Sequence, residues 1–167
     1  MGSIVRSDSL LPNALAYWHR LRGGRRLPLR ADFDPSEVPT LLPYVLITDV
    51  LRDPQDFEYR LLGTALERVF GADFRGKRFS QMVHTKPGTP IWDEYCRVVA
   101  EEVPLRSTVG VLANDRAVHQ GEHVLMPFSD GGDTVDMLMA VVAVTLRPAM
   151  PVVERRPRVP ARLIPSR

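Results

Sequence analysis

Residues 122–146 decide the fold, and they read EHVLMPFSDGGDTVDMLMAVVAVTL. Two runs rich in apolar and β-branched residues, 122–128 and 134–146, flank the five residues S-D-G-G-D. Because glycine adopts positive φ without a Cβ penalty, this sequence is typical of a hairpin turn. The stretch therefore predicts two antiparallel strands, and a run at 105–112 adds a third strand before them.

A second hairpin is predicted earlier in the chain. Residues 44–51 (YVLITDVL) are rich in β-branched and aromatic side chains. Residues 57–62 (FEYRLL) alternate apolar with charged side chains, as a half-buried strand does. The intervening R-D-P-Q-D has the composition of a turn, so these two runs are expected to pair.

Helices are predicted between the two groups of strands. Thr64 and Glu67 form a capping box for a short helix over 64–70. A longer helix is expected over 91–102, with Thr89 as its N-cap and a proline at its first position. Its apolar residues recur at helical spacing on one face, which indicates that this face packs on the sheet.

An amphipathic helix is predicted over 10–22, ahead of the sheet. Apolar residues recur there every three or four positions, and Ser9 offers an N-cap oxygen. This apolar stripe needs a partner, which is either the chain's own domain or the same helix of a second copy. The second alternative predicts a homodimer whose contact is made by Leu11, Leu15, Trp18 and Leu21.

The predicted order of elements is one helix, two strands, short helices, one longer helix and three strands. This order predicts an α+β fold with a five-stranded antiparallel sheet, helices on one face, and the N-terminal amphipathic helix before it. Five phrases follow in a characteristic order: LPLRADFDP at 27–35, LLP at 41–43, DFEYRLLGT at 56–64, GxxxxGK at 71–77 and LMPFSDGG at 125–132. In these features the chain resembles the PAS domain, of a short stand-alone bacterial PAS-like family.

The resemblance runs from about residue 10 to residue 144. It implies a sensory or interaction domain whose sheet and helices can enclose a small ligand, and which commonly dimerises through a helix that precedes the domain. It also implies a free-standing module, since 167 residues leave no room for an attached kinase, cyclase or DNA-binding domain. The family supplies no binding residues that can be carried over to this chain.

Charge is unevenly distributed along the sequence. The formal net charge is +2, yet residues 1–30 carry +5, residues 31–146 carry −8 and residues 147–167 carry +5. We therefore expect an N-terminal helix and basic segment at 1–30, a PAS-like domain at 31–146, and a flexible Pro/Arg-rich tail at 147–167. Removal of the tail is expected to leave the fold intact and to change the net charge from +2 to −3.

Composition excludes several classes of protein. The single cysteine, Cys96, cannot form an internal disulfide or a cysteine-based zinc site. The longest apolar run, 137–146, is about half of the ~20 residues that a membrane-spanning helix needs. The N-terminus lacks the apolar core of a signal peptide. We therefore expect a cytoplasmic protein that does not engage a membrane.

Cys96 and the histidines are the first candidates for chemistry. Some PAS relatives use a cysteine in an N-C-R-F-L-Q phrase to form a photo-adduct with flavin, whereas Cys96 lies in Y-C-R-V-V and is interpreted as a structural residue. His119 and His123, in or near a hairpin, lie too far apart to chelate one metal ion. His84 either contacts a ligand or is an ordinary exposed loop residue. No metal site is predicted, and the cofactor stays unknown because no flavin-adduct or haem motif is present.

A ligand pocket in this architecture would lie between the sheet and the helices. Methionine and aromatic side chains adapt to the shape of a ligand, although they also simply fill cores. Arg60 either points inward to hold an anionic ligand or lies on the surface, paired with Glu58 or Asp49. The candidate pocket residues are Arg60, Trp92, Tyr95, Cys96, Met126, Met137 and Met139.

No catalytic motif is present, so we expect a sensory or signalling module without catalytic activity, which binds a small ligand, a protein partner or both. The alternative is a binder of nucleic acid or of an acidic protein. Its basic residues would be Arg20, Arg22, Arg25, Arg26 and Arg30 near the N-terminus and Arg147, Arg155, Arg156, Arg158 and Arg162 in the tail. No aromatic residue is interleaved in the tail for base stacking, which weighs against nucleic acid. A third alternative is a small enzyme that uses the pocket.

Overall fold

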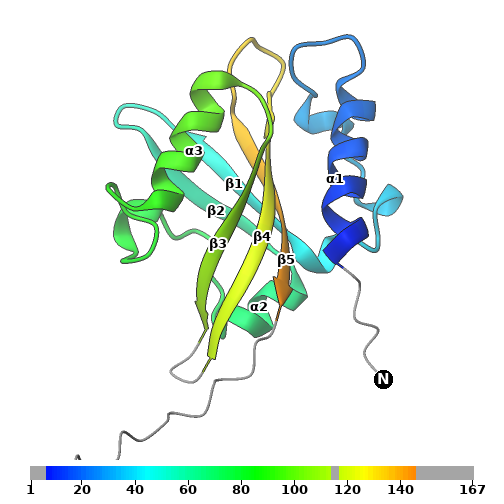
Figure 1. Cartoon of the computed structure of the whole chain (residues 1–167). Helices are drawn as coiled ribbons and strands as arrows, with labels where there is room; N and C mark the ends of the chain where they lie inside the picture. The colour runs from blue at the N-terminus through cyan, green and yellow to red at the C-terminus, as the bar shows by residue number, and fades with distance from the viewer. Residues whose placement is uncertain (1–6, 114–116, 146–167) are drawn as a thin grey trace, which may run out of the picture.

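An antiparallel sheet of five strands forms the centre of the molecule (Figure 1). The computed structural model describes residues 7–113 and 117–145. The strands lie in the spatial order β2-β1-β5-β4-β3, and every neighbouring pair is antiparallel. Their bounds are β1 Val45–Leu51, β2 Asp56–Leu62, β3 Leu105–Ala113, β4 Ala117–Phe128 and β5 Met137–Thr145. The predicted five-stranded antiparallel α+β fold is confirmed.

The α-helices lie on both faces of this sheet: α1 covers one face and stands apart from α2 and α3 in Figure 1. The prediction of an N-terminal helix followed by helices on one face is confirmed, with α1 on the face that α2 and α3 leave open. The α-helices are α1 Ser7–Arg22, α2 Thr64–Phe70 and α3 Pro90–Glu101. Short 3₁₀ turns connect the elements at η1 Arg30–Asp32, η2 Pro35–Glu37, η3 Leu42–Tyr44 and η4 Phe79–Gln81.

Several predicted boundaries shift in the structure. Helix α1 begins at Ser7, so Ser9 lies inside the helix. Strand β5 begins at Met137, three residues later than expected, because Asp136 belongs to the turn, where its carboxylate accepts a hydrogen bond from the Asp130 amide. Strand β4 begins earlier, at Ala117.

The start of α2 differs from the predicted capping box. Its N-cap is Gly63, which has no side chain to form a capping bond, and Thr64 is the first helical residue. A Cβ on Gly63 would lie 2.4 Å from the carbonyl oxygens of Leu42 and Pro43. Glycine is required here because the turn η3 passes directly against the end of β2. At the start of α3, by contrast, the expected Thr89 cap is present and its hydroxyl accepts from the Trp92 amide.

Helix α1 packs on the chain's own sheet, which is the first of the two alternatives for its apolar stripe. Leu11 and Trp18 are each 2% exposed, and Leu15 and Leu21 are half buried against the same cluster. The indole Nε1 of Trp18 donates to the carbonyl oxygen of Pro127 on β4 at 2.8 Å. This bond fixes the position of the helix along the strand.

The opposite face of the sheet packs against α2, η4 and α3. Leu66 of α2, Phe79 of η4, and Tyr95 and Val98 of α3 are buried there against β1, β2 and β5. Both faces of the central strands are therefore covered, which accounts for the near-continuous apolar sequence of β5. The predicted tail at 147–167 lies outside the described residues.

Candidate functional site

A cavity of about 250 Å³ lies between the sheet and the elements α2, η4 and α3. Most of its wall is apolar and much of it aromatic. The aromatic lining residues come from β2, α2, the segment after α2, η4 and α3, and they are Tyr59, Phe70, Phe74, Phe79 and Tyr95. A concave, mostly apolar site of this kind is the usual form of a small-molecule site.

Smaller aliphatic side chains and a few polar ones complete the cavity. Leu46, Ala140 and Val142 form the sheet side, and Met82 and Ile91 lie on the helical side. The exposed His84 lies where the cavity meets the surface. The buried Thr85 also lines the cavity, but its hydroxyl is occupied because it donates to the carbonyl oxygen of Phe79.

The cavity wall includes a buried histidine, His123 on β4, which lies beside a carboxylate. It is 2% exposed, and its Nε2 lies 3.1 Å from Oε2 of Glu94 on α3. The other carboxylate oxygen of Glu94 accepts a hydrogen bond from the hydroxyl of Ser107, which lies opposite His123 in the β3–β4 pairing. Glu94 thus contacts two neighbouring strands from the helix that covers them.

The electrostatics of the wall follow from this arrangement. Burial raises the pKa of Glu94, but the contacts with His123 and Ser107 favour the carboxylate and outweigh it, so that the pKa is lowered overall. Burial raises the pKa of Tyr59 and of Tyr95 well above the usual value. Both phenols are therefore neutral at physiological pH. The carboxylate of Glu94 is ionised and lies next to the imidazole of His123.

The structure does not bring the predicted pocket residues together. Met126, Met137 and Met139 pack on the α1 face of the sheet. Side chains alternate between the two faces along a strand, so Met126 and His123, three residues apart on β4, point to opposite faces. Trp92 packs against Phe57 outside the cavity lining. Of the seven candidate pocket residues, Tyr95 alone lines the described cavity.

Cys96 lies half buried on α3, packed beside the aromatic core and outside the cavity lining. Burial and the nearby Asp93 raise the pKa of its thiol. A raised pKa disfavours the reactive thiolate. This geometry agrees with the interpretation of Cys96 as a structural residue.

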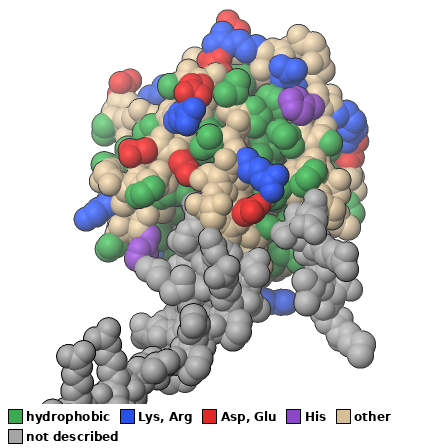
Figure 2. Space-filling model, viewed as in Figure 1, with side chains coloured by type: hydrophobic (Ala, Val, Ile, Leu, Met, Phe, Trp, Pro, Cys, Tyr) green, Lys and Arg blue, Asp and Glu red, His purple; other side chains and the backbone are tan. Residues whose placement is uncertain are grey.

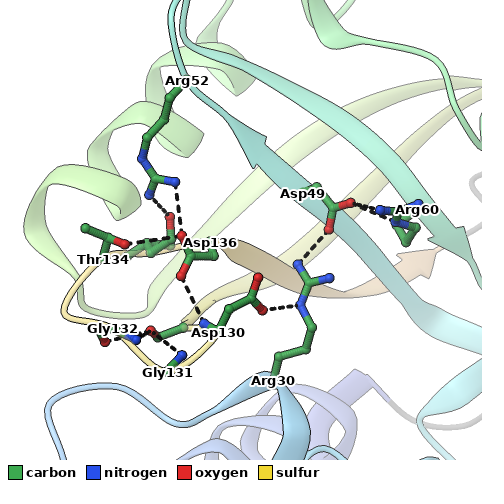
Figure 3. A network of polar contacts seen from close by, with 11 residues as sticks. Arg30, Asp49, Arg52, Arg60, Asp130, Gly131, Gly132, Thr134 and Asp136 are labelled. Carbon is green, nitrogen blue, oxygen red and sulfur yellow. Dashed lines mark hydrogen bonds and ion pairs between the residues drawn. The ribbon is translucent and has the colours of Figure 1, made fainter.

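Arg60 points away from the cavity, as the surface alternative expected. Its guanidinium pairs with Asp49, which also binds Arg30 at 2.7 Å (Figure 3). Arg30 in turn reaches Asp130 in the β4–β5 turn at 2.8 Å. The network joins the segment after α1 to β1 and to the turn, so the phrases quoted at 27–35 and 125–132 meet at one end of the sheet.

Most of the N-terminal arginines pair with acidic residues of the folded domain. Arg20 pairs with Glu37, Arg25 with Asp32 and Arg26 with Glu102, whereas the guanidinium of Arg22 lies over the ring of Trp18. Figure 2 shows acidic and basic side chains interspersed on the face that it presents, with no large patch of one sign. The alternative function in nucleic-acid or acidic-protein binding is not supported by this arrangement. The tail arginines lie outside the described residues.

No group of three or more His, Cys, Asp or Glu side chains among the described residues could hold a metal ion. His123 faces Glu94, and the side chain of His119 lies outside the described set. No helix in the described ranges is long and apolar enough to cross a membrane.

Comparison with known proteins agrees with this architecture. The model of the PAS domain family matches residues 6–143, which is most of the sequence. The chain belongs to the PAS domain family. No curated protein matches the sequence at a significant level.

Two solved structures are similar to this PAS domain in fold. One is a fungal LOV domain photoreceptor, with 9% identity and a TM-score of 0.47, over 70% of this chain and 94% of that one. The other is an RNA-binding light-oxygen-voltage receptor, with 17% identity and a TM-score of 0.46, over 85% of this chain but 34% of that one. Neither likeness bears on what this PAS domain binds.

Most of the residues that line the cavity are not indicated by the sequence pattern. The pattern raises His123 only as a candidate metal ligand, and it gives no sign that Tyr59, Phe70, Phe74 and Phe79 line a cavity. One signal was available, since His123 begins the otherwise apolar run H-V-L-M-P-F. A histidine inside a buried strand needs a polar partner, and a search for that partner would have led to a carboxylate on the covering helix.

Proposed function

We propose that this PAS domain is a sensory module whose cavity binds a small molecule, and that it reports occupancy to a protein partner without catalysing a reaction. The observation that carries the proposal is the 250 Å³ cavity whose wall includes the buried His123, backed by the half-buried Glu94 of α3. A buried ionisable group in an apolar cavity is costly to maintain for packing alone, and such groups are concentrated at functional sites.

The route by which occupancy would be reported follows from the elements that form the cavity. Glu94 belongs to α3, while Ser107 and His123 belong to β3 and β4. A ligand that contacts His123 changes the contact between His123 and Glu94, which holds α3 on these strands. The equilibrium between two positions of α3 then shifts by as much as the ligand's affinities for those two positions differ.

Support for a non-catalytic role comes from the residues themselves. The sequence holds no catalytic motif, and the single thiol has a raised pKa and lies outside the cavity. A cytoplasmic location is likewise proposed, from the single cysteine in the sequence.

Dimerisation stays a prediction, and the packing of α1 constrains it. Leu11 and Trp18 are buried against the chain's own sheet. A dimer formed through α1 would therefore use the half-buried Leu15 and Leu21 or the outer side of the helix. Sedimentation velocity over a range of protein concentrations tests this prediction.

The experiment that tests ligand binding is native mass spectrometry of freshly purified protein, combined with an NMR screen of small aromatic and aliphatic compounds. We expect either a co-purified molecule or compounds that shift the amide signals of His123 and Ala140. Ala140→Leu, which fills the cavity, should abolish both effects, whereas Met139→Leu on the α1 face should preserve them. A folded protein that retains no molecule and responds to no compound contradicts the proposal.

A further inference from the structure

The size of the cavity limits what can enter it. A cavity of about 150 Å³ lined by aliphatic and aromatic residues is enough to bind benzene. Sites for drug-sized ligands start at roughly 300 Å³. At about 250 Å³, this cavity lies between the two and is suited to a compact molecule of one or two fused rings.

The wall favours a flat aromatic molecule. Tyr59, Phe74 and Phe79 present ring surfaces, and their centroids lie 4.8 Å (Tyr59–Phe79) and 5.5 Å (Tyr59–Phe74) apart in tilted contacts. Aromatic rings prefer such offset or edge-to-face contacts with further rings. A ligand ring in the cavity would extend this aromatic cluster.

Formal charge is disfavoured on the ligand. Among the described residues that line the cavity, none is Lys, Arg, Asp or Glu. An ion of either sign would lose its hydration without meeting a permanently charged partner of opposite sign on the wall, which weakens its binding relative to that of a neutral molecule. An anion would in addition meet the field of the ionised Glu94 behind His123.

One polar group on the ligand has a partner. His123 Nε2 and Glu94 Oε2 lie 3.1 Å apart, yet neither atom makes a well-aligned hydrogen bond in the structure. Buried polar atoms in folded proteins are almost always satisfied, so Nε2 of His123, a residue that lines the cavity, is a hydrogen-bonding position without a well-aligned partner. A hydroxyl or N–H group of a ligand next to His123 would fill it.

We propose that the cavity takes an uncharged, compact aromatic molecule that carries one hydroxyl or N–H group, and that His123, positioned by Glu94, recognises that group. The proposal rests on the proposed function, because it specifies the chemical class of the ligand and the residue that selects it.

The test uses four fused-ring probes and calorimetric titration of the full-length protein. The probes are naphthalene, 2-naphthol, 2-naphthoate and 1-methylquinolinium, which share a bicyclic frame and differ in polarity and charge. We expect 2-naphthol to bind about tenfold more tightly than naphthalene, the value of one net hydrogen bond. The two ions should bind at least tenfold more weakly than 2-naphthol.

Two variants assign the effect to the residues. In His123→Leu the tenfold advantage of 2-naphthol over naphthalene should vanish, while naphthalene still binds, which shows that the cavity is intact. Because His123 is buried and its replacement can unfold the protein, Glu94→Gln supplies an independent readout. It removes the negative charge, so 2-naphthoate should gain severalfold in affinity while naphthalene is unchanged. Met139→Leu, on the other face, should alter none of these values.

Each outcome separates this proposal from the proposed function. Equal affinity for naphthalene and 2-naphthol, or tightest binding of a charged probe, overturns the ligand class. A hydroxyl advantage that survives in folded His123→Leu overturns the role of His123. If no probe binds but native mass spectrometry finds another small molecule, the ligand class is wrong and the proposed function stands. If no probe binds and no molecule is found, both are wrong.

Discussion

The two faces of the sheet are both buried, but they are packed in different ways. On the α1 face, Met126, Met137 and Met139 fill the space beneath Trp18, and the packed cluster there includes no residue that lines the cavity. On the α3 face, rings of β2, η4 and α3 meet at an angle and a cavity of about 250 Å³ is left. The same strands contribute alternate residues to the two faces.

The difference follows from the shapes of the side chains. Methionine is unbranched and flexible, so it fills irregular gaps between a helix and a sheet. Phenylalanine and tyrosine are rigid plates, and Phe79 lies 4.7 Å from Tyr95 at 55° between ring planes. Several of these rings border the cavity on the α3 face. The α1 face therefore serves stability, and the α3 face retains room for a ligand.

The largest effect on the free energy of unfolding is expected when a large buried side chain is removed from the α1 face. Trp18→Ala removes a side chain that is 2% exposed, together with its hydrogen bond to Pro127. Large-to-small substitutions of buried aromatic residues cost about 3–5 kcal/mol. We expect a loss of that size in the free energy of unfolding, measured by urea denaturation.

Trp18→Phe is the matched control for that measurement. It keeps a ring in the core but removes the indole N–H that donates to Pro127. The loss should then be roughly 1–3 kcal/mol, since the carbonyl oxygen of Pro127 loses its donor. A loss below about 1 kcal/mol for Trp18→Ala would mean that α1 is not an integral part of the core.

A smaller effect is expected when a residue on the closed face is enlarged. Ala14 of α1 is 1% exposed and is surrounded by the packed cluster. Ala14→Leu adds atoms where there is no space, and overpacking of this kind costs about 1–3 kcal/mol. The measurement is again the midpoint of urea denaturation. An unchanged midpoint would show that the α1 face is packed less tightly than the structure indicates.

The same enlargement on the open face should have the opposite sign. Ala140 of β5 lines the cavity, so the added atoms of Ala140→Leu have free volume to occupy. We expect a gain of about 1 kcal/mol, because apolar atoms are buried without displacing others. Comparison of Ala14→Leu and Ala140→Leu in one denaturation series isolates the difference between the faces. A loss of stability in both variants would show that the two faces of the sheet are packed equally tightly.

The sequence predicted the elements of both faces but not their assignment. Runs of apolar and β-branched residues on either side of the S-D-G-G-D turn are sufficient to predict β4 and β5 and their pairing. Where both faces of a strand are apolar, the sequence does not tell which residues point to which face, so it does not separate Met126, Met137 and Met139 from Tyr95. The cavity itself depends on how rings from five separate segments tilt, and no local pattern records that.

The smallest expected effect concerns the pH dependence of the Glu94–His123 contact. The pKa of Glu94 is lowered in the folded protein: burial opposes the shift, and the contacts with His123 and Ser107 outweigh it. A carboxyl group whose folded pKa is depressed contributes stability above its unfolded pKa, and this contribution is lost as the pH falls through the folded value. Glu94→Gln cannot titrate, so the stability gap between wild type and Glu94→Gln should narrow as the pH is lowered from about 6 to about 3. Thermal denaturation across this range measures the gap.

Glu101→Gln, which removes an exposed carboxylate on the same helix, is the control and should leave the pH profile nearly parallel to wild type. A gap that widens on acidification would show that the carboxylate of Glu94 does not hold α3 against β3 and β4.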